Sequence, residues 1–353
     1  MKLSLSLKIL PIIIIAFLAS LWLRTNTITT DLTMLEKGFL GLSKTTNSLF
    51  DFPYSNLALS NGFTYVSVKF IDSNFNSVIN RVITIFLGII SVLIFYLISK
   101  KITDDYLSSL FSTAIFSIQA SAVFFGKIIN PVILSFVFFL CFLYFLFSIN
   151  KEKKSFLLYS IMTALFLFLS VITNYFIAFV LPFLIMLLII DVRKYLLTIV
   201  LTFVLVLTYY FGFFQNINNQ IMGYFSGRDM FSIGFMSHFL RILQEISIPL
   251  ILLIMVQLNR VFLFSQSSKN ILMTLWLTAI PLIILSILFS KIDLLSSNVV
   301  YLVAVLLIPS GVLLKDFYIK SFNSRIAVII LFLFSIVLSV YQLGQKIAEM
   351  KIF

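Results

Sequence analysis

The most regular feature of the chain is a series of apolar runs separated by shorter polar and charged segments. A bilayer core of about 30 Å needs roughly 20 apolar residues in a helix that rises about 1.5 Å per residue. Eleven uncharged runs approach that length. We therefore predict an all-α polytopic membrane protein with about 11 transmembrane helices and a single integral membrane domain, residues 1–353. The runs are 9–23, 82–99, 106–125, 128–150, 155–173, 178–190, 195–214, 246–258, 271–289, 299–314 and 326–340.

Two details refine this pattern. The first run follows two lysines, but no small-x-small cleavage site follows its core, so it predicts an uncleaved signal anchor. The uncharged stretch 155–190 is too long for one helix. Asn174 and Tyr175, followed by Pro182, predict a tight hairpin between two helices there.

Composition excludes other protein classes. Hydrophobic residues make up 61% of the chain and charged residues only 11%, whereas a soluble domain is about half apolar and about a quarter charged. This balance excludes a soluble enzyme. It also excludes intrinsic disorder, which needs few apolar groups and a high charge density.

The net charge of +12 is spread over small clusters between the apolar runs. This distribution is typical of cytoplasmic loops and argues against a nucleic-acid partner. With the N-terminus inside, inner segments hold 14 of the 25 basic residues, and short outer segments hold only four because long outer loops carry the rest. We expect a multi-pass protein of the cell membrane with a cytoplasmic N-terminus and an extracytoplasmic C-terminus.

Two predicted outer loops are much longer than the others, at 24–81 and 215–245. Long loops in a compact domain are usually functional or disordered. The first loop carries Leu32, Leu35 and Phe39 at helical spacing, which predicts an amphipathic helix in the membrane interface.

The sequence has no Gly-rich phosphate loop, no Cys or His metal spacing and no serine-nucleophile motif, and His238 is its only histidine. Any chemistry must therefore use carboxylates, Lys, Arg and polar aromatics. Asp31 opens the predicted amphipathic helix. Asp is a favoured helix N-cap, worth about 1 kcal/mol, and a carboxylate at the membrane surface could also act as a general base. The two roles are compatible.

Several segments of residues 1–190 together resemble the GT-C superfamily of membrane glycosyltransferases, in its protein O-mannosyltransferase and aminoarabinose transferase branch. The similar features are an uncleaved first helix, a long outer loop that opens with an acidic residue and an amphipathic helix, an aromatic-proline stretch and an arginine before the second helix. In this chain they are Asp31 to Gly38, Phe50-Asp51-Phe52-Pro53-Tyr54, Asn80-Arg81-Val82, Leu93 to Lys101 and Phe125 to Pro131.

The resemblance implies transfer of a sugar from a polyprenyl-phosphate-linked donor to an acceptor at the extracytoplasmic face, with Asp31 as catalytic residue. Basic residues would hold the leaving phosphate and stabilise its developing charge. No cofactor is firmly implied, and a divalent cation stays an open alternative. The candidate donor-phosphate residues are Arg81, Lys127, Arg228, Arg241 and His238.

The chain also departs from the family pattern. Leu32 stands where a second acidic residue is expected, and the segment 124–134 lacks the further carboxylate that many members have. Glu36, about one turn beyond Asp31, is a candidate substitute. Two alternatives therefore stay open: a non-catalytic accessory subunit of the same fold, and a carrier or flippase for a lipid-linked glycan. Spans without ionisable groups argue against the carrier.

Overall fold

The computed structural model describes residues 2–25, 81–128, 130–150, 154–174, 177, 180–212 and 292–352. All regular secondary structure in these residues is helical, and they contain no strand. This confirms the helical class for the described part of the chain. The helices are α1 (Lys2–Thr25), α5 (Val82–Thr103), α6 (Tyr106–Ile118), α7 (Ala120–Phe125), α8 (Val132–Ser148), α9 (Phe156–Thr173), α10 (Leu181–Leu184), α11 (Met186–Gly212), α16 (Ile292–Lys320) and α17 (Phe322–Ile352).

Four of the described helical segments are long and apolar enough to cross a membrane. They are Val82–Thr103, Phe156–Thr173, Asp191–Gly212 and Phe322–Gln345. Shorter apolar segments cover Ile13–Thr25, Tyr106–Ile118 and Val132–Ser148. The predicted spans 246–258 and 271–289 lie outside the described residues.

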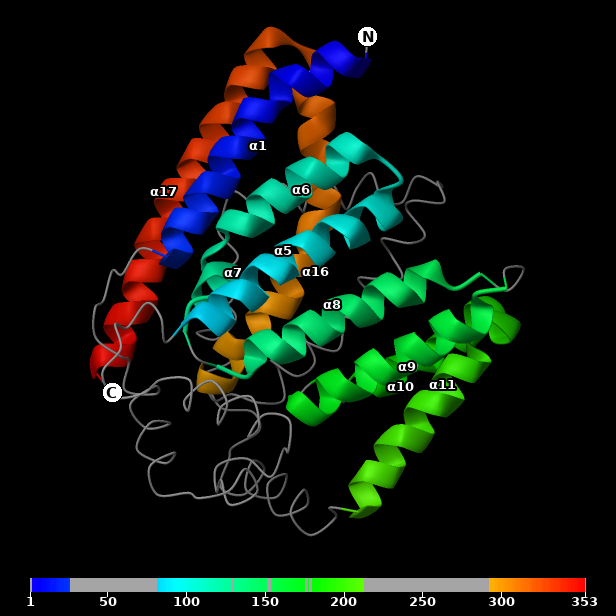
Figure 1. Ribbon diagram of the computed structural model, residues 1–353. Coiled ribbons are helices and arrows are strands. Elements are labelled where there is room, and N and C mark those ends of the chain that lie inside the picture. The colour runs from blue at the N-terminus through cyan, green and yellow to red at the C-terminus, as the bar shows by residue number, and fades with distance from the viewer. Residues whose placement is uncertain are drawn as a thin grey trace, which may run out of the picture.

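The helices form a bundle in which α5, α6 and α8 lie side by side (Figure 1). Helix α9 packs on α8 and α11 on α9, while α16 packs closely against α6. Helices α1 and α17 run next to each other in the same direction, so the start of α1 and the end of α17 lie at opposite ends of the bundle. We call the end toward the start of α1 the Lys100 end, because the last turn of α5 lies there. We call the end toward the last turn of α17 the Arg81 end, because α5 begins there.

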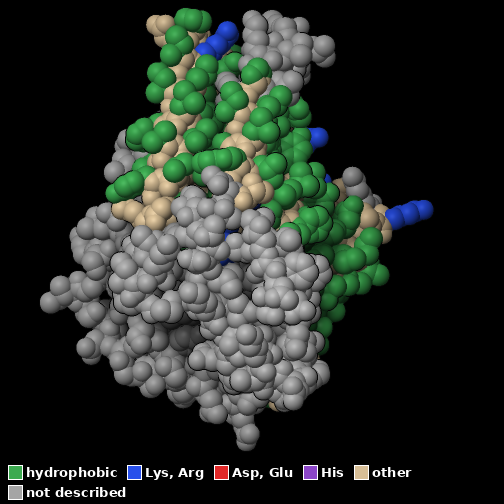
Figure 2. Space-filling model, turned by 60° about the vertical axis from the view of Figure 1, so that its left-hand side comes forward, with side chains coloured by type: hydrophobic (Ala, Val, Ile, Leu, Met, Phe, Trp, Pro, Cys, Tyr) green, Lys and Arg blue, Asp and Glu red, His purple; other side chains and the backbone are tan. Residues whose placement is uncertain are grey.

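The outer helices present apolar side chains on their free surfaces. Figure 2 brings α1 and α17 forward and shows hydrophobic side chains along the visible helices. Leu18 and Trp22 of α1 and Leu333 and Val337 of α17 are more than half exposed. Large contiguous apolar surface of this kind is unfavourable in water and suits contact with lipid. These faces therefore indicate a bilayer environment.

Two predicted spans are interrupted. The run 106–125 forms α6 and α7, which are separated by Gln119 with extended backbone angles (φ −63°, ψ 131°). The run 178–190 forms the short helix α10 and the beginning of α11, which bends at Asp191 (φ −158°, ψ 97°). The bend at Asp191 falls in the charged segment 191–194 that separates the predicted runs 178–190 and 195–214. The hydropathy pattern gives no sign of the break at Gln119, because the run 106–125 is uncharged throughout. In contrast, the predicted break at Asn174 is confirmed, since α9 ends at Thr173.

The contact between α16 and α6 is unusually close at Gly311. The Ser112 hydroxyl of α6 donates to the Ile308 carbonyl of α16 (3.1 Å) and to the Ser108 carbonyl (2.9 Å). A Cβ atom at Gly311 would overlap the Ser112 hydroxyl and the Ser108 carbonyl oxygen, and would lie 2.7 Å from the Ser112 amide nitrogen. The absence of a side chain at Gly311 therefore allows the two backbones to approach, as at other small-residue helix interfaces in membranes.

Buried polar side chains connect α8, α9 and α16. The hydroxyls of Ser135 and Ser170 lie 3.1 Å apart, and each also donates to the other residue's carbonyl. Asn174 donates to the buried hydroxyl of Tyr301 (3.3 Å), whose ring packs edge-on against Phe136. Such interhelical hydrogen bonds contribute about 0.6 kcal/mol each on average. Their main effect is to specify which helix faces meet.

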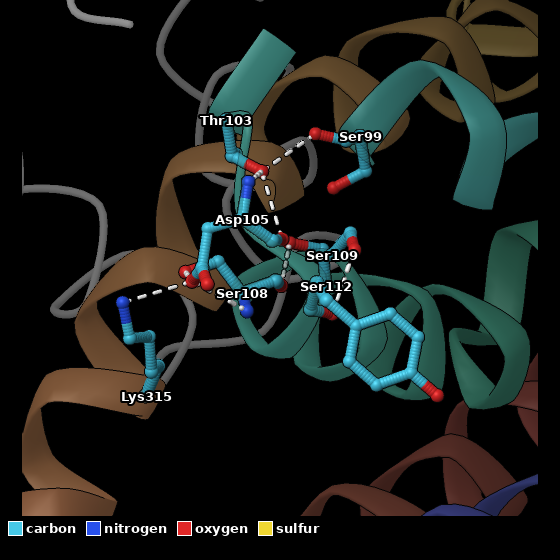
Figure 3. Close-up of polar contacts among 8 residues, drawn as sticks. Ser99, Thr103, Asp105, Ser108, Ser109, Ser112 and Lys315 are labelled. Atoms are coloured by element: carbon cyan, nitrogen blue, oxygen red, sulfur yellow. Dashed lines mark hydrogen bonds and ion pairs between the residues drawn. The ribbon is translucent and has the colours of Figure 1, made fainter. Parts of the chain in front are cut away.

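At the Lys100 end, Asp105 caps α6 and joins it to α16 (Figure 3). Its carboxylate accepts the Ser108 amide (3.0 Å) and the Ser108 hydroxyl, and forms an ion pair with Lys315 Nζ (2.9 Å). Burial by itself raises the pKa of Asp105, but the hydrogen bonds from Ser108 and Lys315 outweigh it, so the pKa lies below its ordinary value of 3.8. The ionised carboxylate is therefore the form that the fold stabilises.

Replacing Asp105 with asparagine is expected to lower stability at pH 7 by less than about 1 kcal/mol, because Asn also caps helices well and only the partly exposed ion pair is lost. A group with a depressed folded pKa stabilises the protein above its unfolded pKa and loses this contribution as the pH falls through the folded value. The difference between the wild type and Asp105→Asn should therefore shrink as the pH falls below 3.8 and disappear once the pH is below the lowered pKa of Asp105. Thermal unfolding in detergent as a function of pH measures it, and a difference that persists unchanged at low pH would contradict this account.

Candidate functional site

Three basic side chains are buried at the Arg81 end of the bundle. Arg24 is in the last turn of α1, Arg81 is the N-cap residue of α5, and Lys127 follows Gly126, the residue that ends α7. Their exposed fractions are only 1%, 2% and 3%. Because an ionised side chain is costly to bury, such groups persist where they are paired, hydrogen-bonded or functional.

Backbone carbonyls surround the Arg24 guanidinium. Nη1 donates to the carbonyl of Ser117 (2.9 Å), which belongs to the last turn of α6, and to the hydroxyl of Ser20. Nη2 donates to the carbonyl of Ala122 in α7 (3.5 Å). The last carbonyls of a helix have no partner within the helix and carry partial negative charge. Arg24 therefore satisfies the Ser117 carbonyl, which the break at Gln119 leaves at the end of α6, and adds a second donor to the Ala122 carbonyl, which also accepts from the Gly126 amide.

Lys127 makes the reciprocal contact, from the end of α7 to α1. Its ammonium group donates to the carbonyl of Leu23 (3.4 Å), in the last turn of α1. The Thr84 hydroxyl contacts the Arg81 carbonyl (2.8 Å) and the Lys127 carbonyl (3.4 Å), so these two backbones are adjacent. Arg81 and Lys127 also take part in further interactions. The start of α5 is thus joined to the end of α7, and the end of α7 is joined to the end of α1.

Two glycines make room for the guanidinium. A Cβ atom at Gly88 would lie 3.0 Å from the Cα atom of Gly126 and 3.1 Å from Arg24 Nε, and one at Gly126 would meet Gly88 and Arg24 equally closely. Within the described residues Nε has no hydrogen-bond acceptor. The side chain is therefore enclosed by backbone atoms of three helical segments.

The cations at the two ends of the bundle differ in exposure. At the Lys100 end, Lys100, Lys101 and Lys320 are exposed, and Lys315 is partly exposed. Exposed Lys and Arg at the ends of apolar helices are typical of the head-group region on the cytoplasmic side. The three cations at the Arg81 end are buried instead, so they do not form a surface belt.

The structure brings together two of the residues predicted from the sequence, Arg81 and Lys127. The other predicted site residues lie outside the described residues: Asp31, Glu36, Arg228, Arg241 and His238. In the described ranges there is no group of three or more His, Cys, Asp or Glu side chains that could hold a metal ion.

Arg24 was not predicted as a site residue. The apolar run ends at Leu23, which places Arg24 in the predicted outer loop 24–81, but α1 continues to Thr25. The signal that could have identified it is its position directly after an apolar run, one helical turn beyond Ser20, where a helix that continues would carry the charge into the bundle.

Comparison with known proteins does not identify the chain. No protein-family model matches it, and no curated protein matches its sequence.

Proposed function

We propose that this chain is a glycosyltransferase of the cell membrane that moves a sugar from a polyprenyl-phosphate-linked donor to an acceptor at the extracytoplasmic face. The observation that carries this proposal is the burial of Arg24, Arg81 and Lys127 at one end of an apolar helical bundle. A donor of this kind has an apolar tail that requires lipid contact and a phosphate that requires cations. Apolar outer faces and buried cations both occur in the described part of the molecule.

The charge distribution supports the membrane orientation in this proposal. Exposed lysines gather at the Lys100 end, which suits the cytoplasmic side, and the buried cations lie at the opposite end. We propose about 11 spans in a GT-C-like arrangement, with the N-terminus cytoplasmic and the C-terminus extracytoplasmic. The donor phosphate would then meet Arg81 and Lys127 from the outer leaflet.

In the proposed reaction the sugar anomeric carbon passes from the donor phosphate to an acceptor hydroxyl. Asp31 is the proposed general base that accepts the hydroxyl proton, with Glu36 as the alternative carboxylate. Arg81 and Lys127 would stabilise the phosphate as it leaves with its bonding electrons. We propose Arg228, Arg241 and His238 as additional contacts to that phosphate.

One observation favours a second function, a carrier or flippase for a lipid-linked glycan. Ionisable groups inside membrane helices often mark transport pathways, and the sequence had suggested that the spans lack them. Arg24, however, belongs to α1 and is fully buried. A carrier would move the labelled lipid across a liposome membrane without releasing its sugar. A non-catalytic accessory subunit, favoured by Leu32, would bind the lipid phosphate and do neither.

Replacing Arg81 or Lys127 with glutamine is expected to raise the KM for a polyprenyl-phosphate sugar about 10- to 100-fold, because a hydrogen bond to a charged group contributes about 1.5 to 3 kcal/mol. The measurement is sugar transfer by the purified protein in liposomes. Lys100→Gln and Lys101→Gln are matched controls, since they remove exposed cations from the opposite end and should leave KM unchanged. Equal effects of all four substitutions, or none, would contradict the proposed phosphate site.

A further inference from the structure

The ends of α1 and α7 are connected by hydrogen bonds from two cations, one at each end. Arg24 of α1 donates to carbonyls of α6 and α7 on either side of the break at Gln119, and Lys127, just beyond α7, donates to the Leu23 carbonyl of α1. Each cation therefore caps helical carbonyls that belong to the other segment. We call this pair of contacts the Arg24–Lys127 latch.

Arginine suits its side of the latch because its nitrogens diverge from a rigid plane. Nη1 and Nη2 contact Ser117 and Ala122, which lie on the two sides of Gln119. A lysine has a single nitrogen on a flexible stem and cannot reproduce this planar fork. The glycines at positions 88 and 126 leave the space that the guanidinium plane occupies.

We propose that Arg24 is a positioning residue that fixes the break between α6 and α7 and thereby holds the Lys127 ammonium at the end of α1, where the predicted first long loop begins. Helix α7 is short: only three residues lie between Ser121 and Phe125, and Gly126 and Lys127 follow at once. A change in the direction of α7 therefore moves Lys127. Leu23, which accepts from Lys127, is eight residues before Asp31 in the sequence. The consequence for sugar transfer rests on the proposed function, whereas the latch itself does not.

The first test measures the latch without any assay of activity. The purified protein is treated with an amine-reactive ester, and the modified fraction of each lysine is measured by mass spectrometry. In the wild type, buried Lys127 should react slowly compared with exposed Lys100 and Lys101. In Arg24→Gln, the reactivity of Lys127 should rise by about tenfold or more, since a charge-assisted contact network is lost, while Lys100 and Lys101 stay unchanged.

Arg325→Gln is the matched control. Arg325 also donates to a backbone carbonyl, that of Tyr318 (3.0 Å), but it begins α17 near the Lys100 end. Its replacement should leave Lys127 protected. If Arg24→Gln does not yield folded protein, Arg24→Lys carries the test, because it retains a cation and can reach only one of the two carbonyls. Wild-type protection of Lys127 in the folded Arg24 variant would overturn the proposal.

The second test asks whether Arg24 acts through Lys127. If it does, Arg24→Gln should raise the donor KM with little change in kcat, and the double variant Arg24→Gln/Lys127→Gln should be no worse than Lys127→Gln alone. If the KM increase of the double variant is instead the product of the two single increases, Arg24 acts independently of Lys127, and this result would overturn the positioning role. Increased labelling of Lys127 together with a wild type that transfers no sugar would remove the proposed function and keep the latch. Wild-type labelling of Lys127 in an Arg24 variant that still transfers sugar would overturn the latch and keep the proposed function.

Discussion

Replacing Gly311 with alanine is expected to destabilise the protein by about 3 kcal/mol or more, at the upper end of the usual cost of overpacking. The added methyl group would overlap both the Ser112 hydroxyl and the Ser108 carbonyl, and it would lie 2.7 Å from the Ser112 amide nitrogen. Two of these three atoms belong to the backbone of α6 and cannot rotate away. Helix α16 must therefore move off α6 or bend, and the Ser112 bond to Ile308 is lost. Thermal unfolding and size-exclusion profiles in detergent measure the effect.

The chain provides matched controls for this substitution. A Cβ atom at Gly212 or Gly344 would have no neighbour within 4 Å. Alanine there should be neutral or stabilising by up to about 1 kcal/mol, because alanine is the better helix former. The double variant Gly311→Ala/Ser112→Ala removes only the side-chain overlap and should recover part of the loss. If Gly311→Ala behaves like the two controls, the close approach of α16 and α6 is wrong.

Replacing Asp31 with asparagine is expected to lower the rate of sugar transfer by a factor of about 10² to 10⁴, the usual contribution of a general base. Asparagine is chosen because it caps helices as well as aspartate does. This substitution therefore removes the proposed base and keeps a good residue at the predicted helix cap. Membrane insertion and thermal stability should stay at wild-type values, and transfer to a supplied acceptor should fall in kcat. Fluorescent or radiolabelled polyprenyl-phosphate sugar in liposomes provides the measurement.

Two further variants complete the comparison. Asp31→Ala removes both the proposed base and the predicted cap, so it should add a stability loss of about 1 kcal/mol to the same loss of rate. Glu36→Gln tests the alternative carboxylate and should have the smaller effect on kcat. Unchanged turnover in Asp31→Asn would exclude the proposed role of Asp31, and a larger loss in Glu36→Gln would transfer that role to Glu36.

Local sequence composition is enough to predict the helical class and the positions of most described helices. Runs of apolar residues without charge satisfy their backbone polar groups internally only as helices when they lie in lipid, so the run 82–99 becomes α5 and the run 155–173 becomes α9. Asn174 ends α9 as expected. Arg81 and Lys127 were identified as candidate cations from the sequence, through a family resemblance. These predictions depend on local composition, which the chain carries within each segment.

Three features follow from tertiary packing and not from local composition: the break at Gln119, the burial of Arg24 and the close contact at Gly311. Each depends on partners far away in the sequence: Arg24 contacts Ser117, 93 residues on, and Ser112 contacts Ile308, 196 residues on. An uncharged helix can be interrupted without cost to its hydropathy when a distant cation satisfies the released carbonyls. Hydropathy along the chain records how well each segment suits lipid, but not which segments meet, because that is set by the shapes and hydrogen bonds of facing side chains.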